Sequence, residues 1–101
     1  PDMVSDDEIA LEWARIPHFY YNYYVFQYAT GFSAAVAIAS RIRAEGAPAV
    51  ADYKRFLSGG SSDDPISLLK IAGVDLSKPD TVENAMKVFE ETIDELAEII
   101  G

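Results

Sequence analysis

The stretch from Ile16 to Ser40 carries no charged residue and constrains the fold of this chain more than any other. It holds the only His and five of the six Tyr residues of the chain. A run of this length could span a membrane, but His18, Gln27 and the phenol hydroxyls favour burial in protein over burial in lipid. The stretch therefore predicts one long helix within a protein, and no membrane partner.

The rest of the chain shows the spacing of amphipathic helices and no strand-like alternation. The predicted class is all-α, with about five helices, of which the aromatic-rich one is the longest. Their predicted ranges are 6–15, 17 or 18 to about 45, 48–57, 66–72, and about 80 to the C-terminal end.

Several residues mark where these helices start and stop. Pro17 disfavours a helical residue before it but suits the first turn of a new helix. Gly46 is the expected stop of the long helix. Asp64 before a proline predicts a cap at a helix start. The pattern Ser77-x-x-Asp80 predicts a capping box for the last helix.

The segment Phe32–Ile42 is small and apolar on all sides, which predicts burial on every side. A domain of 101 residues can hardly surround it, so we expect the natural protein to be larger. Two further helices carry one apolar face each. The residues expected to face inward are Val50, Tyr53, Phe56 and Leu57 in the third helix, and Val82, Met86, Phe89, Ile93, Leu96 and Ile100 in the last.

Composition excludes several function classes. A net charge of −9 argues against nucleic acid or anionic lipid as a partner. The chain has no Cys and no signal-peptide pattern, which suits a reducing compartment such as the cytoplasm. The carboxylates of the last helix spread along a solvated face, and Gly59-Gly60 reads as a helix stop. A single His cannot build a typical catalytic zinc site alone, so no metal ligand is assigned.

A helical projection of the aromatic stretch separates its side chains into two faces. At roughly 100° per residue, Tyr21, Tyr24 and Tyr28 fall within about 60° of each other, with Gly31 beside them. His18 lies about one residue step, roughly 100°, away from them around the predicted helix. The opposite side carries Phe19, Tyr23 and Phe26 and predicts a packing face.

The face that carries Tyr21, Tyr24 and Tyr28, which we call the phenol face, has two interpretations that the pattern alone leaves open. Neutral phenols remain hydrogen-bond donors at neutral pH, and donors fixed on a rigid element can stabilise a developing oxyanion. Tyr residues at helical spacing also commonly fill a core, where each hydroxyl finds a backbone partner. The single His is equally open to a structural role.

The string IPHFYYNYYVFQYATGFSAA resembles the C-terminal part of oligoendopeptidase F, in the M3 family of zinc metallopeptidases. The resemblance covers nearly the whole chain. It continues through the segment EG-P-AV-Y--FL-SGGS, through P--LLK-AGVD and into the final helix. The run from His-Phe-Tyr to Tyr-Ala-Thr-Gly is the most specific part.

The resemblance implies a fragment, residues 1–101, of a cytoplasmic oligopeptidase whose helical shell surrounds a deep channel. It implies zinc held by an HExxH helix and a downstream Glu. In that family, the helix that corresponds to Ile16–Ser40 faces the zinc across the channel. The His and Tyr residues of that helix hold the substrate and polarise the scissile carbonyl. Carried over, His18, Tyr24 and Tyr28 are the catalytic candidates, and Tyr21 and Gly31 join them in binding an oligopeptide.

The chain departs from the family pattern because it contains no HExxH. The resemblance therefore implies a C-terminal segment whose partner is the preceding part of the same enzyme, and whose isolated form is inactive. A dimer through exposed apolar surface stays open. The alternative is a non-catalytic helical module that docks partner helices.

Overall fold

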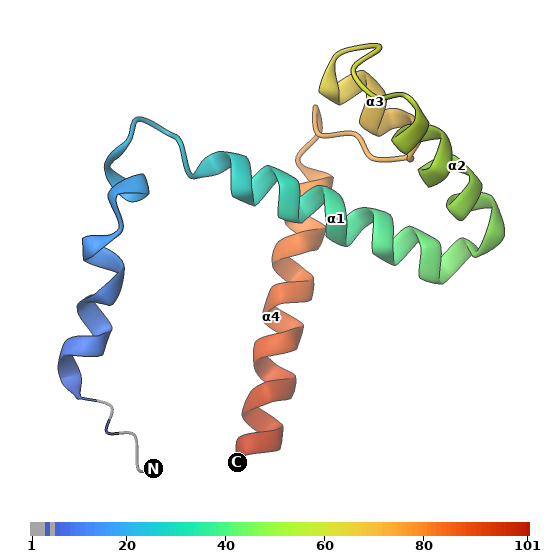
Figure 1. The fold of residues 1–101 in the computed structure, drawn as a ribbon. Helices are drawn as coiled ribbons and strands as arrows, with labels where there is room; N and C mark the ends of the chain where they lie inside the picture. Colours follow the sequence, from blue (N-terminus) through green and yellow to red (C-terminus); the bar gives the residue numbers. More distant parts are fainter. Residues whose placement is uncertain (1–3, 5) are drawn as a thin grey trace.

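The computed structural model describes residue 4 and residues 6–101, and every regular element in that part of the chain is helical (Figure 1). The all-α prediction is confirmed. The elements are the 3₁₀ helices η1 (Asp7–Arg15) and η2 (Pro17–Tyr20), and the α-helices α1 (Phe26–Glu45), α2 (Ala47–Ser58), α3 (Pro65–Ile71) and α4 (Asp80–Ile100).

Most of the predicted helix ends are confirmed. The carboxylate of Asp6 accepts the Glu8 N–H at the start of η1. Gly46 ends α1 with φ +68°, a conformation that favours glycine. The Asp64 carboxylate accepts two backbone N–H groups at the start of α3. Local side-chain chemistry therefore sets these boundaries.

The prediction of one helix from residue 17 to residue 45 is wrong. Pro17 starts only a short 3₁₀ turn, and residues 21–25 form a turn before α1 begins at Phe26. Within this turn Tyr23 has φ +52°, which is incompatible with a right-handed helix. Much of the aromatic stretch therefore precedes the long helix instead of lying in it.

The predicted capping box at Ser77 is also wrong. The Ser77 hydroxyl and N–H both donate to the Asp75 carboxylate, at 2.5 Å and 3.0 Å. The Thr81 hydroxyl donates to the Asp75 carbonyl at 3.1 Å. These bonds shape the loop before α4, and no side chain caps the start of that helix.

Helix α1 is the central element of the fold. It packs against α4 and α2, and α2 packs against α3 (Figure 1). The Cα radius of gyration is 17.8 Å, whereas a compact domain of this size has about 13 Å. The arrangement is therefore extended, with few elements on either side of α1.

The core is correspondingly small. Its buried apolar residues are Ala34, Ala49, Leu68, Ala72, Val74 and Ala85.

Phe32–Ile42 is not covered on every side within this chain, as expected of a chain too small to surround it. Only Ser33 and Ala34 are buried there, because no further helix covers the other sides of α1. Leu57 is exposed, contrary to prediction. The apolar stripe of α4 is also exposed, with Phe89 and Leu96 both at 54%. Much apolar surface is therefore left without a neighbour in this chain.

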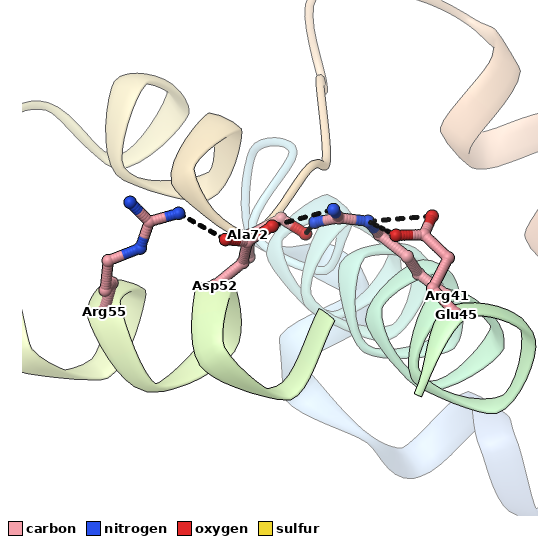
Figure 2. Close-up of polar contacts among 5 residues, drawn as sticks. All are labelled: Arg41, Glu45, Asp52, Arg55 and Ala72. Carbon is pink, nitrogen blue, oxygen red and sulfur yellow. Dashed lines mark hydrogen bonds and ion pairs between the residues drawn. The ribbon is translucent and has the colours of Figure 1, made fainter. Parts of the chain in front are cut away.

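Arg41 ties together three parts of the fold (Figure 2). Its guanidinium donates to the Asp52 carboxylate of α2 at 2.7 Å and to the Ala72 carbonyl after α3 at 2.9 Å. It also donates to Glu45 of α1 at 3.1 Å. Asp52 accepts a second hydrogen bond from Arg55. The planar, permanently charged guanidinium suits such a branched contact.

No helix among the described residues has both the length and the apolar character needed to cross a membrane.

Replacing Gly73 by Ala should destabilise the chain. Gly73 has φ +78°, and an added Cβ would clash with the guanidinium of Arg41. A left-handed conformation alone costs a residue with a Cβ about 1–2 kcal/mol. Urea unfolding of the 101-residue chain measures the loss. The matched control is Gly31→Ala, whose added Cβ would meet nothing within 4 Å. Because Gly31 lies inside a helix, this substitution should stabilise the chain by up to about 1 kcal/mol. Equal stability of Gly73→Ala and the unmodified chain would contradict the account.

Stability should depend on the charge of Asp52. Hydrogen bonds from Arg55 and then Arg41 lower the pKa of Asp52 from its ordinary value of 3.8. A carboxyl whose pKa is lowered by folding stabilises the fold above that ordinary value, and the contribution is lost as pH falls through the folded-state pKa. Asp52→Asn should therefore destabilise at pH 7, and the gap should close below about pH 4. Denaturation of both chains across pH 2.5–7 tests this, and a gap independent of pH would refute it.

Candidate functional site

Four aromatic rings form a continuous cluster where the chain enters α1. His18 comes from η2, Tyr21 and Tyr24 from the following turn, and Tyr28 from the first turn of α1. The His18 ring centroid lies 5.8 Å from that of Tyr21 and 5.4 Å from that of Tyr24. Tyr24 lies 6.2 Å from Tyr21 and 6.1 Å from Tyr28. These are ordinary distances for aromatic contact.

The structure thus brings together the four ring-bearing residues that the sequence singled out. It does so by a different route from the predicted one, because a turn and not a continuous helix places His18 beside Tyr24. We call these four residues, His18, Tyr21, Tyr24 and Tyr28, the donor cluster.

The phenol hydroxyls of the donor cluster are not used to satisfy the backbone. Tyr20, outside the cluster, donates to the Ala14 carbonyl at 2.6 Å. Within the part of the chain that the structure describes, the hydroxyls of Tyr21, Tyr24 and Tyr28 donate to no backbone carbonyl. All three phenols are exposed, so their hydroxyls need no protein partner and remain accessible to a ligand.

The Tyr24 side chain influences the phenol of Tyr28. Hydrogen bonding with the Tyr24 side chain is the largest of the causes that raise the pKa of Tyr28. A raised pKa keeps the phenol protonated well above neutral pH, so Tyr28 remains a hydrogen-bond donor. The pair can therefore present neutral donors to an oxygen that gains negative charge.

The cluster is accessible from solvent in this chain. Tyr24 is 38% exposed and Tyr28 is 61% exposed. The predicted packing face is confirmed only in part. Phe19 packs edge-on against Trp13 at 6.3 Å, whereas Phe26 is 61% exposed. The phenol face and the packing face therefore differ less in burial than the helical projection indicated.

Gly31 lies one helical turn beyond Tyr28 on α1. A Cβ placed on it would meet no atom within 4 Å. No other backbone among the described residues approaches Gly31 closely. Gly31 instead opens onto a cleft of about 970 Å³ between α1, α2 and α3. That volume lies at the upper end of the range for small-molecule sites.

Sequence reasoning did not associate this cleft with the aromatic cluster. Its walls include Ile38 from α1, Tyr53 and Phe56 from α2, and Leu68 from α3. The sequence already predicted that Tyr53 and Phe56 face inward from the third helix. Their proximity to Gly31 follows only from the way α2 folds back along α1.

The donor cluster does not fit a metal ion. It offers one imidazole and three neutral phenols. Among the described residues, no group of three or more His, Cys, Asp or Glu side chains could hold a metal. The arrangement can bind and polarise an oxygen, but it does not supply the ligand set of a catalytic zinc site.

Comparison with known proteins assigns this chain to a family. Residues 1–88 match the model of peptidase family M3. Oligopeptidase PepF of Bacillus subtilis is 60% identical over 98 residues, which cover 97% of this chain and 15% of the relative. Group B oligopeptidase PepB of Streptococcus agalactiae is 50% identical, over 92% of this chain and 16% of the relative.

A solved structure is similar over the same extent. The crystal structure of oligoendopeptidase-F from Enterococcus faecium matches 100% of this chain and 19% of its own, with 48% identity and a TM-score of 0.71. This chain therefore corresponds in length to less than a fifth of these relatives. The family model and the high identities together show that the chain belongs to peptidase family M3.

Proposed function

We propose that this chain supplies the substrate-binding and oxyanion-stabilising side of a zinc-dependent oligoendopeptidase that hydrolyses short peptides. One observation carries the proposal. His18, Tyr24 and Tyr28 form one cluster of contacting rings whose phenols are open to solvent. The resemblance to oligopeptidases over nearly the whole chain supplies the reaction class.

The chemistry follows from what peptide hydrolysis demands. Attack of water on the scissile carbonyl turns its oxygen into an oxyanion, and preformed donors aimed at that oxygen lower the barrier. We assign this donation to the hydroxyl of Tyr24 or Tyr28. His18, whose ring contacts Tyr24, donates to the same oxygen or to a neighbouring substrate carbonyl. Tyr21 and Gly31 line the path of the peptide backbone.

The zinc belongs to a part of the peptidase outside this chain. The donor cluster lacks a zinc ligand set, and the sequence contains one His and no HExxH. We accordingly assign residues 1–101 to the C-terminal part of the catalytic domain, with the preceding part of the same enzyme as their partner. The isolated chain would then be inactive.

The exposed apolar surface supports this assignment. The stripe of α4 and the outer side of Phe32–Ile42 lie open in this chain. Large open apolar patches mark interaction surfaces. Packing by the rest of the enzyme would cover them and would exclude water from the donor cluster, which strengthens its hydrogen bonds. The absence of Cys suits a reducing compartment, and we assign the enzyme to the cytoplasm.

Tyr28→Phe should lower kcat far more than it raises KM, because the lost donor acts in the transition state. The loss of one such donor costs about 10²–10³ in kcat. The assay uses a chimera in which this chain replaces its matching segment of B. subtilis oligopeptidase PepF, with a quenched fluorescent peptide as substrate. Tyr20→Phe is the matched control, because its hydroxyl bonds Ala14 outside the cluster.

Two outcomes would reject parts of this account. An unchanged kcat in Tyr28→Phe removes the catalytic role of that phenol. A chimera that folds but hydrolyses nothing, even without substitution, favours the alternative of a non-catalytic helical interaction module.

A further inference from the structure

Tyr23 has a backbone conformation that no other residue with a Cβ shares among those the structure describes. Its φ is +52°, in the left-handed region. There the Cβ of an L-residue crowds the following carbonyl oxygen, so glycine or asparagine is usual. An unfavourable conformation of this kind persists only when the surrounding structure holds it, and it occurs often at functional sites.

The Tyr23 side chain does not explain this conformation. It is 88% exposed. Its ring contacts no other ring of the described residues, in contrast to its neighbours Tyr21 and Tyr24. Whatever Tyr23 contributes to the fold therefore comes through its backbone.

The backbone of Tyr23 closes a tight turn. The Tyr24 N–H donates to the Tyr21 carbonyl at 3.2 Å, which makes Tyr23 the third residue of a four-residue turn. The Phe26 N–H then donates to the Tyr23 carbonyl at 3.2 Å, and α1 begins. Tyr23 thus marks the point at which the chain changes direction into α1.

This turn is what brings His18 against Tyr24. In a continuous helix, His18 and Tyr24 would be six residues apart, about 120° around the axis and about 9 Å along it. In the structure their ring centroids are 5.4 Å apart. The contact spans the turn at Tyr23, so the turn, and not helical periodicity, creates it.

We propose that Tyr23 is a positioning residue whose left-handed backbone holds His18 against Tyr24 and thereby assembles the donor cluster. Its effect on catalysis rests on the function proposed above, whereas its effect on geometry does not. The phenol ring of Tyr23 is dispensable, and the φ of residue 23 is the property that matters.

Two substitutions that both remove the ring isolate the backbone. Tyr23→Asn keeps a residue that tolerates positive φ, and Tyr23→Val introduces a β-branched residue that disfavours it. In the 101-residue chain, nuclear Overhauser effects between the His18 and Tyr24 rings should be present in the unmodified protein and in Tyr23→Asn. They should be lost in Tyr23→Val, with the helicity of α1 and α4 retained.

Each contrary result overturns the proposal. Cross-peaks that persist in Tyr23→Val show that the turn does not need this φ. Cross-peaks lost in Tyr23→Asn show that the ring, and not the backbone, is required. Their absence from the unmodified chain shows that the cluster does not form.

Kinetics in the PepF chimera separate this inference from the proposed function. Tyr23→Val should lower kcat by up to about 10²-fold, the size expected for misplaced catalytic groups, and Tyr23→Asn should restore it. If the ring contacts respond as described while kcat does not change, the catalytic role of the cluster fails and the positioning role stands. If Tyr28→Phe is inactive while both Tyr23 variants behave alike, the positioning role fails and the proposed function stands.

Discussion

The arrangement of this chain depends on the guanidinium of Arg41. Among the described residues, it is the one side-chain group that connects α1, α2 and the residue after α3 (Figure 2). With so few buried apolar side chains, the angle between α1 and the α2–α3 pair has little else to fix it. Gly73 leaves the room that this guanidinium occupies. Arg41 thus connects helices whose other residues line the cleft onto which Gly31 opens.

The same helix connects this structural contact to the candidate site. Arg41 bonds the C-terminal part of α1 to α2, and the N-terminal part of α1 carries Tyr28 and Gly31. A rigid helix with one end fixed can present a donor in a constant direction, which is what oxyanion stabilisation requires. The turn at Tyr23 places His18 against Tyr24, next to the donor that α1 carries. A fold with a small core can thus still present an ordered set of donors.

The sequence predicted the parts of the fold that local chemistry controls. The all-α class, the stops at Gly46 and Gly59 and the cap at Asp64 follow from individual residues. The members of the donor cluster were also predictable, since hydroxyl-bearing aromatics gather in one stretch. The break at residues 21–25 was not, because nothing in a Tyr-Asn-Tyr-Tyr run signals positive φ at Tyr23. Likewise, the bonds of Arg41 depend on tertiary packing, which helical periodicity does not reveal.

The central claim is that His18, Tyr24 and Tyr28 act together on the oxygen of the scissile carbonyl. A crystal structure of the PepF chimera with a phosphinic peptide, whose tetrahedral oxygens imitate the oxyanion, tests it most directly. The account predicts the hydroxyl of Tyr24 or Tyr28 about 2.7–3.1 Å from a phosphinate oxygen, with His18 bonded to the same oxygen or to an adjacent substrate carbonyl. A phosphinate that contacts none of the three would contradict it.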